Sequence, residues 1–88
     1  MLIKAKNNRK QDISVEEFFA KYLEFSYNKN LVEQTTRILK MLLRHPDAVE
    51  YIAVKLDDRF AFSVFGMNRK YTVVFTITNQ SIILLNIM

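Results

Sequence analysis

The sequence predicts an α+β domain in which an N-terminal antiparallel helical hairpin packs on one face of a four-stranded antiparallel β-meander. Apolar residues recur with the period of a helix before residue 46 and alternate with a period of two after it. Turn residues separate the later runs at a spacing of about ten residues, as in successive hairpins. The 88 residues form a single domain, residues 1–88. We expect helices over residues 15–27 and 31–44 and strands over residues 50–56, 60–67, 70–78 and 81–87.

Capping residues predict where the two helices begin and end. Ser14 and Glu17 have the spacing of a capping box, which predicts the start of the first helix. Asn30 precedes the second helix and is expected to cap it. Pro46 ends the second helix, because a residue before proline disfavours the helical conformation. The short connection between the helices implies an antiparallel pair.

The lengths of the three turns predict which residues share a face of the sheet. A three-residue turn at 57–59 and two-residue turns at 68–69 and 79–80 give one sheet face a continuous apolar set, and we assign this face to the helices. Its residues are Ile52, Val54, Leu56, Phe60, Phe62, Val64, Tyr71, Val73, Phe75, Ile77, Ile82 and Leu84. In this register Asn86 lies on the helix side, beside Val73. A short extra strand over residues 1–6 is expected to pair beside the last strand.

The opposite face of the predicted sheet is apolar near the last strand. Contiguous exposed apolar patches usually mark interaction sites. This pattern predicts an interaction surface that is covered by a second copy of the chain, as a homodimer, or by another protein partner. Its predicted residues are Phe65, Val74, Ile83, Leu85 and Ile87.

The charge and composition leave a nucleic-acid interface open as an alternative. The net charge is +4, and the isoelectric point is near 9.5, which permits binding to a polyanion. The alternative reading of each basic residue is ordinary solvated surface. The candidate phosphate contacts are a basic N-terminal run and three turn residues: Lys4, Lys6, Arg9, Lys10, Arg59, Arg69 and Lys70.

Catalytic, cofactor and membrane functions have little support in the sequence. Cysteine is absent, which removes thiolate chemistry and disulfides and favours a cytoplasmic location. No apolar run resembles a signal peptide or is long enough to cross a bilayer. His45 is the single histidine and is expected to cap a helix end instead of acting as a base. We expect no catalytic residue, no metal, no cofactor, no membrane contact and no small-molecule substrate.

The order of the elements resembles the RelE/ParE toxin superfamily. Residues 59–78 and 81–87 resemble the sheet of that family, and Val73-Val74-Phe75-Thr76 is similar to strands of BrnT-type members. The resemblance implies mRNA cleavage on the ribosome or gyrase inhibition, with an antitoxin as partner. The basic residues it carries over are Arg59, Arg69 and Lys70, together with Tyr71. Residues 82–88 contain no His, Arg, Lys or Tyr, where ribonucleases of the family place such groups, so a non-catalytic relative fits better.

We therefore expect a non-catalytic protein-interaction domain, a small homodimeric regulator or inhibitor of the kind that phages or mobile elements encode. The alternative is a toxin of the RelE/ParE type, with an endoribonuclease activity if it is an enzyme, or another nucleic-acid-binding protein.

Overall fold

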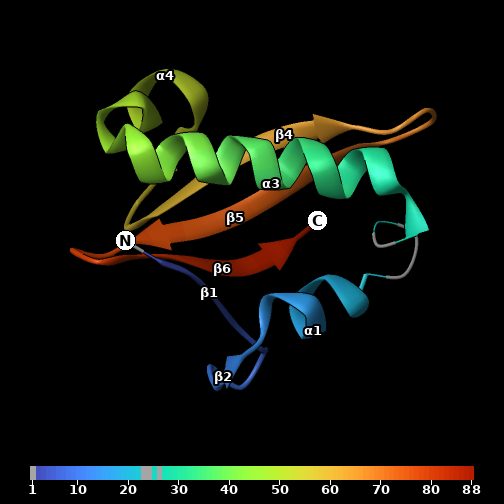
Figure 1. Ribbon diagram of the computed structural model, residues 1–88, viewed down its shortest axis with the longest axis horizontal. Helices are drawn as coiled ribbons and strands as arrows, with labels where there is room; N and C mark the ends of the chain where they lie inside the picture. The colour runs from blue at the N-terminus through green and yellow to red at the C-terminus, as the bar shows by residue number, and fades with distance from the viewer. Residues whose placement is uncertain (1, 23–24, 26) are drawn as a thin grey trace.

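The computed structural model describes residues 2–22, 25 and 27–88 and has a six-stranded mixed sheet with helices on one face (Figure 1). The α+β class is confirmed, but the antiparallel meander of four strands is part of a larger mixed sheet. The strand order is β2-β1-β6-β5-β4-β3. The strands are β1 (Leu2–Lys6), β2 (Asp12–Ile13), β3 (Val54–Leu56), β4 (Arg59–Phe65), β5 (Lys70–Ile77) and β6 (Ser81–Ile87). The helices are α1 (Val15–Ala20), α3 (Lys29–Arg44) and α4 (Val49–Ile52), with a 3₁₀ turn, η1 (Pro46–Ala48).

The two predicted helix starts have different outcomes. Ser14 caps α1 as predicted, because its Oγ accepts a hydrogen bond from the Glu17 backbone N–H at 3.0 Å. The predicted first helix, residues 15–27, is interrupted, because α1 ends at Ala20 and Lys21 and Tyr22 form a turn and a bend. Phe25 and Tyr27 are again helical, and residues 23, 24 and 26 lie outside the described residues. The second helix starts earlier than predicted. Asn28, not Asn30, is its cap, and the Asn28 Oδ1 accepts from the N–H groups two and three residues later.

The segment after Pro46 was wrongly predicted to be a strand from residue 50. It forms η1 and α4, and β3 begins only at Val54. Proline is favoured in the first turn of a helix, where its fixed φ is helical and its missing N–H is not needed. Ala48, Val49 and Ile52 then follow a helical spacing and pack against the core.

The predicted N-terminal strand is confirmed as β1, which pairs in parallel with β6 from Leu2–Ser81 to Ala5–Leu84. Strand β6 therefore lies inside the sheet between β1 and β5, as Figure 1 shows. Strand β2 adds a short antiparallel edge to β1 through a hairpin loop. The pairing of β1 with β6 ends at Ala5 and Leu84. The last residues of β6 therefore pair with β5 on one side and have no β1 partner on the other.

Two turns differ from the prediction and have different consequences. The β3–β4 turn has two residues, because Leu56 pairs with Arg59, and Asp57 adopts a left-handed φ of 56°. This one-residue change moves Val54 and Leu56 to the face opposite the helices. In the β4–β5 turn Phe65 pairs with Lys70, so the loop is four residues long instead of two. That change of two residues keeps every side chain on its predicted face.

A β-bulge in β6 corrects the predicted faces of its last residues. Phe75 pairs with Leu84 as predicted, but Val74 then pairs with Asn86 and Val73 with Ile87. Leu85 is thus the extra residue in β6, which reverses the alternation that follows it. Ile87 belongs to the core instead of the predicted interaction surface, and Asn86 lies opposite Val74 instead of beside Val73.

The core lies between the helices and one sheet face. Helix α1 packs near β1 and α3 crosses over β4 (Figure 1). The Phe25 and Tyr71 rings meet edge to face with centroids 5.4 Å apart, which joins the α1 side of the core to β5. Thr35 is buried in α3 and donates its hydroxyl to the Leu31 carbonyl at 2.9 Å. The largest fully buried side chains are Phe18, Phe25, Phe75, Leu31, Leu39, Leu42, Ile82 and Leu84.

Candidate binding surfaces

The sheet face opposite the helices, here called the open face, is not covered by any described helix. Alternation along the strands and the observed register assign its residues. From the β1 side to the β3 edge, the open face carries Lys4, Ile83, Asn86, Thr72, Val74, Thr76, Ala61, Ser63, Phe65, Val54 and Leu56.

Several large apolar side chains of the open face are in contact with solvent. Exposed fractions are 66% for Val54, 49% for Leu56 and 62% for Phe65. Met88 is 57% exposed and exchanges two backbone hydrogen bonds of 2.9 Å with Thr72, which continues the β5–β6 pairing. The sequence prediction missed Val54 and Leu56, because it assumed a three-residue β3–β4 turn.

The predicted apolar patch is divided by the structure. Phe65 is exposed on the open face, Ile83 and Leu85 are half-buried, and Ile87 is buried in the core. Val74 is buried although it faces away from the helices. It lines a hollow of about 420 Å³ whose other lining residues are Leu56, Asp57, Asp58, Arg59, Asn86 and Met88. The open face is therefore concave, with an apolar floor and a charged rim at its β3–β4 end.

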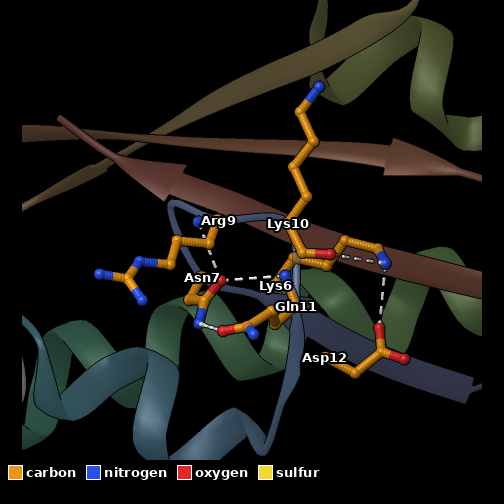
Figure 2. A network of polar contacts seen from close by, with 6 residues as sticks. All are labelled: Lys6, Asn7, Arg9, Lys10, Gln11 and Asp12. Carbon is orange, nitrogen blue, oxygen red and sulfur yellow. Dashed lines mark hydrogen bonds and ion pairs between the residues drawn. The ribbon is translucent and has the colours of Figure 1, made fainter.

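The loop between β1 and β2 is held in shape by Asn7 (Figure 2). The Asn7 Oδ1 accepts hydrogen bonds from the backbone N–H groups of Arg9 and Gln11, both at 2.9 Å. The Asn7 side-chain amide also donates to the Gln11 Oε1 at 3.0 Å. Lys10 has a left-handed φ of 62°, and its backbone N–H donates to the Asn7 carbonyl at 2.9 Å.

One lysine of the basic N-terminal run is neutralised by a neighbouring acid. The Lys6 Nζ lies 3.0 Å from Asp12 Oδ1 and 3.4 Å from the Lys10 carbonyl. The hydrogen bond from Lys6 and its positive charge lower the pKa of the exposed Asp12 carboxyl below its ordinary value. In Figure 2 the Lys6 and Arg9 side chains point in opposite directions, so Arg9 does not share this acid.

Arg9 lines a second depression, the polar hollow, of about 580 Å³. It lies between the β1–β2 loop, the end of α1 and the last residues of β6, where β1 has left the sheet. The Tyr22 hydroxyl donates to Asn86 Oδ1 at 2.8 Å, and the same oxygen accepts from the Ile87 backbone N–H at 2.9 Å. The lining residues are Asn7, Asn8, Arg9, Gln11, Lys21, Tyr22 and Asn86.

Lys21 was not predicted as a site residue, although it lines the hollow and its ammonium lies near two aromatic rings. Its Nζ lies 5.6 Å from the Phe18 ring centroid and 5.7 Å from that of Tyr22. Both distances are within the range of cation–π attraction. The sequence carried no signal for this role, because the first helix was predicted to continue through Lys21, whereas α1 ends at Ala20.

The remaining predicted cations are distributed over the surface. Arg59 lies 4.0 Å from Asp58, and the Arg69 guanidinium lies 4.7 Å from the centroid of the Tyr71 ring. Lys4 pairs with Ile83, and Lys70 pairs with Phe65. The structure therefore does not bring the predicted phosphate contacts together at one site.

The remaining candidate groups are the single histidine, metal-binding clusters and membrane helices. His45 is an exposed residue that ends α3, as predicted. Within residues 2–22, 25 and 27–88, no cluster of three His, Asp or Glu side chains could hold a metal ion. No helix among these residues has the length and apolar character needed to cross a membrane.

Comparison of the chain with protein-family models, with curated proteins and with solved structures finds no match.

Proposed function

We propose that this protein acts by binding another copy of itself through the open face, as a small homodimeric regulator without catalytic activity. The observation that carries this proposal is the exposure of Val54, Leu56, Phe65 and Met88 on a sheet face that no described helix covers. An antiparallel sheet can face water on one side, but that side is then normally polar. Apolar side chains at these four positions favour a face that is covered in the functional state.

The dimensions of the chain are sufficient for such an interface. A standard interface buries about 800 Å² on each partner, which is about one eighth of the 6126 Å² surface of this chain. The two longer extents, 32 and 28 Å, bound a projected face of roughly 900 Å². A face-to-face dimer would therefore need most of the open face, including its exposed edge at β3.

The charges on the open face also fit self-association. Asp57 and Asp58 outnumber Arg59, which lies 4.0 Å from Asp58, at one end of the strands, and Lys70 lies at the other end, opposite Phe65. A two-fold axis that crosses the strands would place the acidic end of one copy against the basic end of its partner. Such complementary charges fix register and orientation more than they add affinity.

The test is the solution mass, measured by light scattering over a dilution series. We expect the wild-type chain to approach twice 10.4 kDa at high concentration. Phe65→Asp and Val54→Asp should give folded monomers, because each would place an unpaired charge inside the interface. Tyr51→Asp is the matched control, since Tyr51 is 89% exposed on α4, away from the open face. A wild-type monomer at every concentration would refute homodimerisation, as would equal dissociation of the control.

A second candidate is a toxin-like action on RNA, which the resemblance to the RelE/ParE superfamily implies. The order of the elements supports it, because the basic strand β1 and the helices precede the strands that resemble the sheet of that superfamily. Induced expression in bacteria should then arrest growth, and Arg69→Ala with Lys70→Ala should relieve the arrest. Harmless expression of the wild-type chain would remove this candidate.

A further inference from the structure

The polar hollow combines cations and hydrogen-bonding groups without an acidic lining residue among those described. Arg9 and Lys21 provide the positive charge, and Asn8 and Gln11 provide side-chain amides. The two ion pairs found among the described residues join Lys6 to Asp12 and Arg59 to Asp58. Neither pair uses the charge of Arg9 or Lys21, so both cations remain available to an anion in the hollow.

The hollow is also organised before any ligand arrives. Asn7 fixes the β1–β2 loop, because its side-chain oxygen accepts hydrogen bonds from two backbone N–H groups of that loop. Lys21 lies over the Phe18 and Tyr22 rings, and Tyr22 is held by its bond to Asn86. A site whose loop and side chains are already ordered loses less conformational entropy when it binds.

The chemistry of the lining favours a phosphate group that belongs to a single-stranded nucleic acid. A guanidinium presents a planar set of donors that matches phosphate oxygens, and the net charge of +4 attracts a polyanion. The side-chain amides of Asn and Gln can pair with base edges. Those edges are free in unstacked single strands, whereas a duplex keeps them in its grooves.

We propose that the polar hollow binds single-stranded nucleic acid, with Arg9 and Lys21 on the phosphate backbone and Asn8 and Gln11 toward a base. Asn86 lines both this hollow and the hollow of the open face, but the four residues proposed to contact the strand are not among those assigned to the open face, so the proposal does not depend on homodimerisation. It also differs from the set of cations predicted from the sequence, because it retains Arg9, adds Lys21 and leaves out Lys6, whose charge Asp12 neutralises.

The test is a fluorescence-anisotropy titration of a labelled 12-nucleotide RNA of mixed sequence at 50 and 200 mM salt. We expect binding to the wild-type chain, with Arg9→Gln and Lys21→Gln each weakening it about tenfold, the usual effect of losing one charge-assisted hydrogen bond. Each of these variants should also reduce the slope of log affinity against log salt by about 0.7, the value for one phosphate contact on a single strand. Asn7→Ala should weaken binding without changing the salt slope, because it loosens the loop and removes no charge.

The control is Arg37→Gln, which removes the same charge from the exposed surface of α3. It should change the affinity by less than about twofold, as an exposed charge outside the site should. Equal weakening by Arg37→Gln and Arg9→Gln would assign binding to net charge and overturn the proposal. Absence of binding at 50 mM salt would also overturn it.

Titrations with other ligands identify the molecule that supplies the phosphate. Duplex RNA of the same sequence should bind more weakly than the single strand. A DNA strand of the same sequence tests whether the hollow distinguishes the sugar, and binding to either strand supports the proposal. If millimolar inorganic phosphate displaces the strand completely, or if the duplex binds as tightly, the single-strand assignment is wrong. Circular dichroism of every variant ensures that a loss of affinity is not a loss of fold.

Discussion

Ile87→Ala tests the bulge that places Ile87 in the core and not on the open face. Ile87 is 5% exposed and pairs with Val73, which is fully buried on the helix side. Truncation of a buried isoleucine to alanine costs about 2–5 kcal/mol. A cost of about 3 kcal/mol would lower the melting temperature of a domain of this size by about 12–24 °C. Leu85→Ala should cost only about 1 kcal/mol, because Leu85 is the half-buried extra residue of the bulge.

The assay is urea unfolding followed by circular dichroism at a low, fixed protein concentration. A domain of 88 residues has a total stability of about 4–13 kcal/mol, so Ile87→Ala could unfold completely. Ile87→Val keeps the test interpretable, since it should cost about 0.5–1.5 kcal/mol. A larger loss for Leu85→Ala than for Ile87→Ala would refute the bulge. A folded Ile87→Ala of unchanged stability and reduced self-association would instead place Ile87 on the open face.

Two further predictions concern polar contacts around the polar hollow. In a double-mutant cycle measured by urea unfolding, Tyr22→Phe and Asn86→Ala should show a coupling energy of about 1 kcal/mol. The reason is that each change removes one partner of their 2.8 Å hydrogen bond. Strictly additive losses of stability would mean that this bond does not stabilise the fold. The second prediction concerns pH. The pKa of Asp12 is lowered in the folded chain by Lys6, so its contribution to stability is present above the ordinary carboxyl pKa and is lost as pH falls through the folded value. Wild type should therefore be more stable than Asp12→Asn at pH 7, and this small difference should shrink at pH 3; a difference that grows on acidification would contradict the reasoning.

Local signals predicted the elements of this fold better than their junctions. Ser14 caps α1 as its capping box indicates, and α3 ends before Pro46 as expected. Asn28 and Asn30 lie two residues apart, and both have side chains that favour a cap. The sequence pattern therefore predicted a cap in the right segment but could not select Asn28.

The residues after Pro46 show why a period of two is a weak signal over a short segment. Glu50 to Leu56 alternate well enough to suggest a strand, but the first residues are helical. Because Val49 and Ile52 pack against the core from a short helix, tertiary contacts decide the conformation there. Such contacts involve partners distant in sequence and are not visible in a local pattern.

The candidate surfaces were less predictable than the core, since both depend on register. An error of one residue at the β3–β4 turn concealed Val54 and Leu56, while an error of two at the next turn changed no face. The bulge at Leu85 had no signal in the apolar pattern, because residues 82–85 and Ile87 are apolar and fit either face. The predicted register placed Asn86 on the helix side beside Val73, and the bulge moves it opposite Val74.

The two proposed surfaces should respond to salt in opposite directions. Association through the open face brings together two chains of net charge +4, and this repulsion is screened as ionic strength rises. Exposed apolar side chains provide the attraction there, and added salt does not weaken it. Nucleic-acid binding in the polar hollow depends on counterion release and weakens steeply with salt. A single salt series that measures both mass and RNA affinity would therefore separate the proposals: a mass that falls with salt would argue against an apolar interface, and an RNA affinity that does not change would argue against phosphate contacts.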